Sequence, residues 1–409
     1  MPTSFPGNQQ PDYQLTDAQD IDYYDVFADI PAADRIIWQR TRQFAEAHVD
    51  TMRQGWNEHH YPLEVARAMG QAGLINDGVD HPDIEKFSPL AAGLVNMELS
   101  RVDGSLGTIL AVQGGLALRT ITMFGAEDQQ AKYVRAIVDV EIPAAFGLTE
   151  PDHGSDSTGL STTATRQADG SYVIRGSKRW IGNGSAGGIT ITFARVDDEG
   201  AEDHGKVRGF IVPQDAEGYT GTPIRHKGSL RAIDQANIFY DDVHVDVEAL
   251  IPGVKSFRNV SEVLYATRIG VAWSALGHAT AVFESALAYA TQRKQFGKYL
   301  AEHQMIQERL TRMLSELVSM QLYMVRIAQL EAAGTLQPTQ AALAKYNNTR
   351  VARRIAADAR DMLGGNGILL ENGVIQHMAD IEGIHTYEGT ESVQALLVGR
   401  DITGYGAFA

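Results

Sequence analysis

A single acidic residue near the C-terminal end of the chain lies in surroundings that suit proton transfer. Glu388 stands between a tyrosine and a glycine in the segment Ile384-His-Thr-Tyr-Glu-Gly-Thr-Glu-Ser-Val393, which apolar, helix-like runs flank. An ionised carboxylate is poorly solvated in such a place, and burial raises a carboxyl pKa toward neutrality. Glu388 is therefore a candidate general base. The alternative for such a carboxylate is a solvated position at a helix end, the role that we assign to Glu391.

A glycine-rich stretch at residues 182–187, Gly-Asn-Gly-Ser-Ala-Gly, matches the GxGxxG pattern of dinucleotide-binding loops. That pattern binds pyrophosphate only when a helix N-terminus follows it. Here the next run is Ile-Thr-Ile-Thr-Phe-Ala-Arg-Val, which predicts a strand. We therefore expect a turn between two strands, with glycines at left-handed positions.

Other common catalytic patterns find little support. The adjacent histidines His59 and His60, and the pair His377 and His385, do not have the spacing of two metal ligands on one helical face. We expect no metal site. No G-x-S-x-G elbow and no G-x-x-x-x-G-K-[ST] loop occurs in the sequence, so hydrolase and nucleoside-triphosphatase activities lack their usual signatures.

Composition describes an ordinary globular chain. Its 409 residues exceed the size of one core, so two or three domains are expected. The formal charge of −16 argues against nucleic-acid binding. With no cysteine, any redox chemistry must come from an organic cofactor. The start lacks the pattern of a signal peptide, and the apolar run at residues 269–290 contains a histidine and a glutamate, so a cytoplasmic protein without a membrane span is expected.

The local residue patterns divide the chain into a leader and three domains. After a polar leader, residues 1–25, helical periodicity runs through residues 26–143. Short β-branched and aromatic runs separated by turns fill residues 144–252. Helical signals return in residues 253–409, where Trp273, Leu276, Thr280, Phe283, Leu287 and Ala290 follow one helical face. The fold class is therefore α+β and multidomain.

Several ordered segments resemble the acyl-CoA dehydrogenase family over nearly the whole chain from about residue 30 onward. They are FGLTEPDHGSD (146–156), SKRWIGNG (177–184), TRIGVAWSALG (267–277), RKQFGKYLAEHQMIQERL (293–310), ARDMLGGNGI (359–368) and TYEGTESVQALLVGR (386–400). The C-terminal run looks most similar to the glutaryl-CoA dehydrogenase branch. The resemblance implies a helical N-terminal domain, a middle β-barrel and a C-terminal four-helix bundle.

The resemblance also implies FAD, bound in a homotetramer built from two dimers. Flavin contacts carry over to Phe146, Leu148, Thr149, Gly154, Ser155, Trp180, Ile181, Thr390 and Ser392. In the family, the adenine end is reached from a neighbouring subunit by the residues matching Arg293, Phe296, Gln304, Asp361, Gly364 and Gly365. The implied partners are an acyl-CoA substrate and an electron-transferring flavoprotein.

Glu388 matches the catalytic base of the family, which removes the α-proton of an acyl-CoA while the β-hydrogen leaves as hydride to flavin N5. Some relatives carry the base on another helix, at the position of Thr267 here, which cannot serve. The resemblance implies that the backbone N–H of Glu388 stabilises the thioester oxygen. It also implies substrate contacts from Ser155, Arg268, Gly107, Arg400 and Gly389, whose missing side chain lets the thioester approach.

Two positions depart from the family pattern. Gly182 replaces the threonine that bonds flavin N5, which predicts an altered flavin potential or altered access to N5. Gly107 stands where glutaryl-CoA dehydrogenases have an arginine for the distal carboxylate, so such a tail would be desolvated without a partner. A small residue there predicts a different or branched acyl tail.

The leading functional hypothesis is an FAD-dependent acyl-CoA dehydrogenase that forms a trans-2-enoyl-CoA. Three alternatives remain open at the level of sequence: glutaryl-CoA dehydrogenase itself, an acyl-CoA oxidase, and a non-catalytic relative that keeps the flavin but acts by binding.

Overall fold

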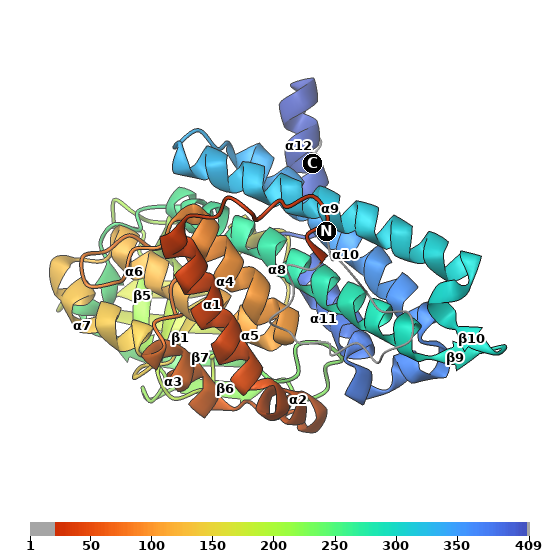
Figure 1. Cartoon of the computed structure of the whole chain (residues 1–409). Coiled ribbons are helices and arrows are strands. Elements are labelled where there is room, and N and C mark those ends of the chain that lie inside the picture. Colours follow the sequence, from red (N-terminus) through yellow and green to blue (C-terminus); the bar gives the residue numbers. More distant parts are fainter. Residues whose placement is uncertain (1–20, 407–409) are drawn as a thin grey trace.

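The computed structural model describes residues 21–406, which fold as a helical N-terminal region, a β region and a helical C-terminal region in that order (Figure 1). The expected leader lies outside the described residues as far as residue 20. Its last residues belong to the fold, because Ile21 and Asp22 are buried and the Asp22 carboxylate accepts the backbone N–H groups of Val26 and Phe27 at 2.7 Å.

The N-terminal region is helical throughout. It comprises α1 (Ala32–Ala47), α2 (Val49–Glu58), α3 (Leu63–Gln71), α4 (Pro89–Val102), α5 (Gly104–Leu110), the π-helix η2 (Ala111–Leu118), α6 (Arg119–Phe124) and α7 (Glu127–Val138). Ser88 caps α4 by accepting the N–H of Ala91, with Pro89 in the first turn. Asp103 ends α4 and caps α5 by accepting the N–H of Ser105.

The run from α5 to α6 has the length and composition of a membrane span. In Gly104–Phe124, however, 72% of the most apolar window is buried inside the protein, as expected for a core helix. Its middle, η2, is the kind of π-helical turn that often marks a functional site.

The middle region is one sheet of eight strands. The strands are β1 (Ala144–Gly147), β2 (Thr163–Arg166), β3 (Tyr172–Gly182), β4 (Ile189–Val196), β5 (Val207–Pro213), β6 (Tyr219–Pro223), β7 (Gln235–Val245) and β8 (Leu250–Ile251). They pair in the order β6-β7-β3-β2-β4-β5-β8, and β1 adds to β4 in parallel. No pairing joins β6 to β8 among residues 21–406, so hydrogen bonds do not close the sheet into the expected barrel.

The stretch at residues 182–187 connects β3 to β4, as predicted from the strand that follows it. Asn183 and Gly187 adopt φ values of +61° and +83° there, which gives the turn its left-handed positions.

The C-terminal region packs four helices side by side and projects a fifth (Figure 1). The four are α8 (Phe257–Gln292), α9 (Gln304–Ala332), α10 (Pro338–Met362) and α11 (Val374–Thr386), and α12 (Glu391–Thr403) extends away from them. The hairpin β9 (Lys294–Gln295) and β10 (Lys298–Tyr299) follows α8, and short 3-10 turns η6 (Gly364–Ile368) and η7 (Leu370–Asn372) follow α10.

The long helix α8 was predicted to bury one face. In the structure every residue from 271 to 284 is buried, because α4 covers one side of α8 while α9, α10 and α11 cover the others. A single core therefore joins the N-terminal and C-terminal helices.

Candidate active site

Glu388 lies in the short link between α11 and α12, in a backbone conformation that few residues other than glycine adopt. Its φ is +55°, and that of Gly389 is +81°. A non-glycine residue in the left-handed region is strained by about 1 kcal/mol or more and persists only where its surroundings hold it. Strain of this kind is concentrated at functional sites, which agrees with the role predicted for Glu388.

Two side chains hold this link in place. Gln394 Nε2, one turn into α12, donates to the carbonyl oxygens of Glu388 and Gly389, both at 3.0 Å. Lys345 Nζ on α10 donates to the carbonyl oxygens of Tyr387 and Gly389. The link that carries Glu388 is thus held from two helices, and neither Gln394 nor Lys345 was singled out from the sequence.

The carboxyl group of Glu388 is enclosed. The residue as a whole is only half-buried, but Oε2 is buried and has no hydrogen-bond partner among the described residues. Burial raises the pKa of Glu388 to about 7, against the opposing effects of Lys345, Arg268 and the Thr267 hydroxyl. A base with this pKa ionises readily near neutral pH and still attracts a proton.

The cations around Glu388 are themselves desolvated. Lys345 has no exposed surface, and burial lowers its pKa while the nearby Glu388 carboxylate opposes that change. Burial likewise lowers the pKa of Arg268, again with Glu388 opposing, and Arg268 Nε is buried without a hydrogen-bond partner among residues 21–406. Arg268 therefore lies close to Glu388 and has an unpartnered donor.

Gly389 and Thr390 make contacts within the link that were not predicted from the sequence. A Cβ on Gly389 would lie 2.4 Å from Gln394 Nε2, so the lack of a side chain lets the Gln394 amide pack there, in addition to the backbone requirement. Thr390 caps α12 by accepting the N–H of Val393 at 3.3 Å. Glu391 pairs with Arg350 and with His385 Nε2 near the surface, the solvated role expected for it.

The segments predicted to hold the isoalloxazine come together at the edge of the β region. Arg179 N–H donates to the carbonyl of Thr149 at 2.8 Å, which brings residues 146–149 beside the end of β3. There Trp180 has φ of +65° and its side chain is 50% exposed, whereas Phe146, Leu148 and Ile181 are buried. An exposed indole beside main-chain donors and acceptors fits a flat, polar-edged ring. Gly154 and Ser155 lie in the open loop that follows β1.

Gly182, at the end of β3, faces the π-helix. A Cβ there would lie 2.8 Å from Val112 Cγ2, so the valine fills the space that a threonine side chain at residue 182 would need. The departure at Gly182 is therefore coupled to a second residue, in η2.

The remaining predicted flavin residues lie in the C-terminal region and not in the β region. Arg293, Phe296 and Gln304 surround the β9–β10 hairpin after α8, a helix of 36 residues that spans about 54 Å. Phe296 is 94% exposed with φ of +54°. The set Asp361, Gly364 and Gly365 is also exposed, at the end of α10, and Ser392 is exposed at the start of α12.

Two further predicted substrate residues, Gly107 and Arg400, lie on α5 and α12. Gly107 is buried in α5, and a Cβ there would lie 2.1 Å from Ser100 Oγ, which donates to Ser274 Oγ at 2.8 Å. The space beside Gly107 is therefore filled by a serine pair. Arg400 is exposed near the end of the projecting α12. No group of metal-binding side chains was found in the part of the chain that the structure describes.

Comparison with known proteins decides the family. Models of the acyl-CoA dehydrogenase N-terminal, middle and C-terminal domains match residues 31–141, 145–243 and 257–403. The mitochondrial short-chain specific acyl-CoA dehydrogenase of Mus musculus is 32% identical over 378 residues, or 90% of each chain. The chain belongs to the acyl-CoA dehydrogenase family. It has acyl-CoA dehydrogenase activity, and FAD is its cofactor.

Solved structures of the acyl-CoA dehydrogenase family share the whole fold. Glutaryl-CoA dehydrogenase from Mycobacterium smegmatis is 34% identical with a TM-score of 0.91, covering 96% of this chain and 99% of that one. A glutaryl-CoA dehydrogenase from Mycobacterium smegmatis in complex with FADH2 is 31% identical with a TM-score of 0.90, covering 94% of this chain and 98% of that one. A structure reported with the electron-transferring flavoprotein of Acidaminococcus fermentans is 28% identical with a TM-score of 0.86, covering 92% of this chain and 99% of that one.

Proposed function

We propose that this acyl-CoA dehydrogenase removes the α-proton of an acyl-CoA thioester with the Glu388 carboxylate. The observation that carries the proposal is the buried, unpartnered Oε2 of Glu388, held on a strained link by Lys345 and Gln394. The proton passes from the α-carbon to that carboxylate, and the product is a trans-2-enoyl-CoA. FAD, when bound, accepts the β-hydrogen together with its electron pair.

The acidity of the α-carbon has to be raised while the proton leaves. We propose that the backbone N–H of Glu388 donates to the thioester oxygen, where the negative charge develops. The left-handed conformation of Glu388 and Gly389 fixes the direction of this N–H, because Gln394 and Lys345 bind the carbonyl groups around it. Arg268, with its free Nε, orients the carboxylate or the substrate beside it.

The FAD site is proposed from the same arrangement. Trp180, Thr149 and the loop carrying Ser155 would hold the isoalloxazine and the ribityl chain in the chain that also supplies Glu388. The β9–β10 hairpin and the end of α10 would serve the adenine end of FAD in a neighbouring subunit, as the residues matching them do in the family.

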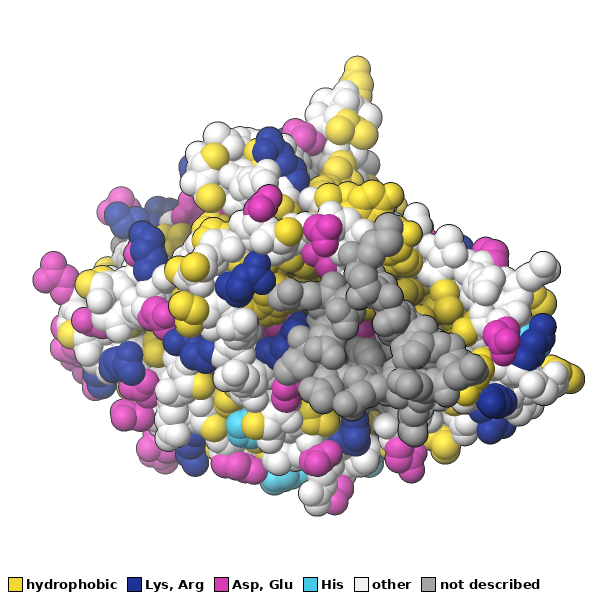
Figure 2. Space-filling model, in the orientation of Figure 1, with side chains coloured by type: hydrophobic (Ala, Val, Ile, Leu, Met, Phe, Trp, Pro, Cys, Tyr) yellow, Lys and Arg dark blue, Asp and Glu magenta, His cyan; other side chains and the backbone are white. Residues whose placement is uncertain are grey.

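A homotetramer agrees with the surface of the molecule. The projecting α12 exposes Ile402 at 78%, and Tyr405, just beyond the end of the helix, is 81% exposed. Figure 2 shows further hydrophobic surface at the base of α12. Isolated apolar helices of this kind are normally covered by a partner. An electron-transferring flavoprotein as electron acceptor is proposed from the family alone. A cytoplasmic location is likewise a proposal, since relatives are both mitochondrial and bacterial.

A dicarboxylyl-CoA is the less favoured substrate. The similarity to the glutaryl-CoA dehydrogenase structure is a similarity of the whole fold and does not identify the acyl tail. At the position where such a tail would need a cation, Gly107 supplies none, and the pair of serines fills the space beside it. Glutaryl-CoA dehydrogenase activity is therefore kept as the second candidate.

The test is flavin reduction by the FAD-loaded enzyme with butyryl-, isobutyryl-, glutaryl- and long-chain acyl-CoA. We expect Glu388→Gln to lower the rate of flavin bleaching by a factor of at least about 10³ while thioester binding persists. Glu391→Gln is the matched control, because that carboxylate pairs at the surface three residues away. Bleaching at the normal rate in Glu388→Gln would exclude Glu388 as the base.

The competing activities separate in the same assay. Peroxide formed without an artificial electron acceptor would identify an oxidase. A biological effect that survives Glu388→Gln unchanged would favour a non-catalytic flavin-binding protein.

A further inference from the structure

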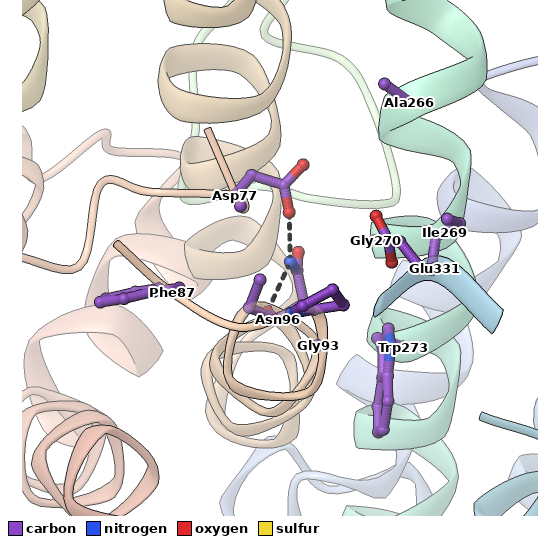
Figure 3. Close-up of a pocket in the computed structure, with 12 residues that line it drawn as sticks. Asp77, Phe87, Gly93, Asn96, Ala266, Ile269, Gly270, Trp273 and Glu331 are labelled. Atoms are coloured by element: carbon purple, nitrogen blue, oxygen red, sulfur yellow. Dashed lines mark hydrogen bonds between the residues drawn. The ribbon is translucent and has the colours of Figure 1, made fainter. Parts of the chain in front are cut away.

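A small polar cavity lies between α4 and α8, among residues to which the proposed reaction gives no role. It has a volume of about 50 Å³, and its walls include Asp77, Phe87, Asn96, Gly270 and Trp273 (Figure 3). A cavity of that size has room for one or two water molecules or the end group of a short chain. The exposed Glu331, at the end of α9, stands at its mouth.

The cavity lies close to the residues around the proposed base. Thr267 contacts the Glu388 carboxylate, and Gly270 and Trp273 follow on the same helix, with Trp273 about 9 Å further along the axis. A Cβ on Gly115 of η2 would lie 2.8 Å from Asp77 Oδ2 and 3.4 Å from Thr267 Cγ2. A Cβ on Gly270 would lie 3.2 Å from Asp77 Oδ1. The absence of a side chain at these two positions lets the Asp77 carboxylate pack beside Thr267, which is next to Glu388.

The far wall of the cavity offers hydrogen-bond groups of both kinds. Asp77 is buried, and its Oδ1 accepts from Asn96 Nδ2 at 2.6 Å, while its Oδ2 lies 3.9 Å from Arg119 Nη2. Trp273 is only 1% exposed, and its Nε1 has no hydrogen-bond partner among the described residues. An indole N–H buried without an acceptor is unfavourable, so its presence in a cavity wall indicates a ligand atom that accepts from it.

We propose that this cavity selects short acyl chains that end in a neutral hydroxyl group. Such an oxygen accepts from the Trp273 N–H, and its own hydrogen is donated to the Asp77 carboxylate. The inference rests on the proposed function, because it assigns the far end of the same substrate.

The other possible chain ends fit less well. A carboxylate would face Asp77 and Glu331, two acidic groups for the one nearby cation, Arg119. A methyl group would leave the indole N–H desolvated without a partner. An ammonium group could donate to Asp77 but could not accept from Trp273.

The test compares four thioesters with the FAD-loaded wild-type enzyme: valeryl-, 4-hydroxybutyryl-, 4-aminobutyryl- and glutaryl-CoA. We expect kcat/KM for 4-hydroxybutyryl-CoA to exceed that for valeryl-CoA at least tenfold, with the two charged thioesters below both. In Trp273→Phe and in Asp77→Asn, the ratio of the hydroxyl to the methyl compound should fall at least fivefold. Asp80→Asn, an exposed carboxylate of the same loop that pairs with Lys86, is the matched control.

A binding measurement separates recognition from chemistry. In Glu388→Gln enzyme, the dissociation constant of 4-hydroxybutyryl-CoA should be at least tenfold lower than that of valeryl-CoA, and Asp77→Asn should remove the difference. A wild-type preference for valeryl-, 4-aminobutyryl- or glutaryl-CoA would overturn the inference and leave the dehydrogenase activity intact. Failure of all acyl-CoA thioesters to bleach the flavin would instead overturn the proposed function.

Discussion

Lys345 donates hydrogen bonds to the backbone carbonyl groups on both sides of Glu388, so a fully buried ammonium group lies against the proposed base. The charge of each group shifts the pKa of the other in the direction opposite to the shift that burial causes. Burial raises the pKa of Glu388, and the charge of Lys345 limits that rise. Lys345 therefore positions the link through its hydrogen bonds and also limits the rise in the pKa of Glu388.

Lys345→Met should move the pH dependence of flavin reduction upward. The carboxylate must be ionised to act, so the wild-type rate should rise with pH through about 7, the pKa of Glu388. Removal of the cation destabilises the ionised form, and we expect the midpoint to rise by about one unit, which is roughly a tenfold loss of rate well below it. The measurement is single-turnover flavin bleaching between pH 6 and pH 9.

Arg354→Met is the control for Lys345→Met, since Arg354 lies on the same helix and pairs with Glu316 at the surface. A midpoint that stays at the wild-type pH, or moves to lower pH, would show that Lys345 exerts no electrostatic effect on Glu388. A lower rate at every pH with the same midpoint would mean that Lys345 acts only through its hydrogen bonds to the backbone.

The order of the three regions was predictable because it follows from local periodicity. The link between β3 and β4 was predictable for the same reason, since the strand after Gly187 can be read directly from the sequence. Lys345 could not be found in this way. Its segment, Ala341-Ala-Leu-Ala-Lys345, is typical of any helix, and only the packing of α10 against the link after α11 buries the ammonium group.

Asp77 and Trp273 show the same limit. They are distant in the sequence, and the chemical meaning of both depends on the cavity between α4 and α8. The single-face interpretation of α8 was also too narrow, because a spacing pattern identifies one buried face but says nothing of partners on the others. The substrate-tail position predicted at Gly107 rested on the resemblance to the family, and only the structure shows that Ser100 and Ser274 pack beside it.

Gly182→Thr should destabilise the protein unless Val112 is also changed. A Cβ at residue 182 would lie 2.8 Å from Val112 Cγ2, and a β-branched valine in a helix has few rotamers into which it can move. We expect the single variant to lose about 1 to 3 kcal/mol of unfolding free energy, measured by urea unfolding of the FAD-loaded enzyme. The flavin content per chain should fall with it.

The double variant Gly182→Thr with Val112→Ala then tests the role of residue 182 toward FAD. The two substitutions should couple favourably by at least about 0.5 kcal/mol, since one creates the space that the other fills. With the fold restored, we expect the reduction potential of the bound flavin to differ from that of the wild type. Strict additivity of the two unfolding free energies would show that the predicted clash does not occur.

Glu98→Gln should be strongly destabilising. Glu98 is fully buried on α4 and accepts from Arg42 Nη2 at 2.6 Å and from Trp38 Nε1 at 2.6 Å, with Arg101 Nη1 at 3.4 Å. Loss of its charge removes a carboxylate that two buried guanidinium groups share, although Arg101 keeps its ion pair with Glu284 at 2.7 Å. Breaking a buried charged network in this way typically removes about 3 to 5 kcal/mol.

Urea unfolding at pH 7.5 measures the effect of Glu98→Gln, with Glu85→Gln as control. Glu85 pairs with Arg40 in a half-exposed ion pair, for which about 0 to 1 kcal/mol is expected. Equal losses in the two variants would mean that the buried network contributes no more than a surface pair.

His278 and His377 should make the fold sensitive to mild acid. Their Nδ1 atoms lie 2.8 Å apart in the core, so one ring donates and the other accepts, and the contact cannot form when both rings are protonated. Burial lowers the pKa of His377 to about 4 and that of His278 well below its usual value. The folded pair therefore stays neutral where the unfolded chain takes up protons.

The sign of this effect follows from proton binding. Below pH 6.5 the unfolded state binds more protons than the folded state, so stability falls as the pH falls from 6.5 toward 4. At pH 5 each histidine accounts for roughly 2 kcal/mol. Urea unfolding at pH 7.5 and pH 5 should show a smaller loss in His377→Gln than in the wild type. The variant comparison is needed because burial raises the pKa of Asp380 to about 8 and of Asp103 to about 6, which favours the fold in acid. An equal loss in both proteins would mean that the pair takes up its protons within the fold.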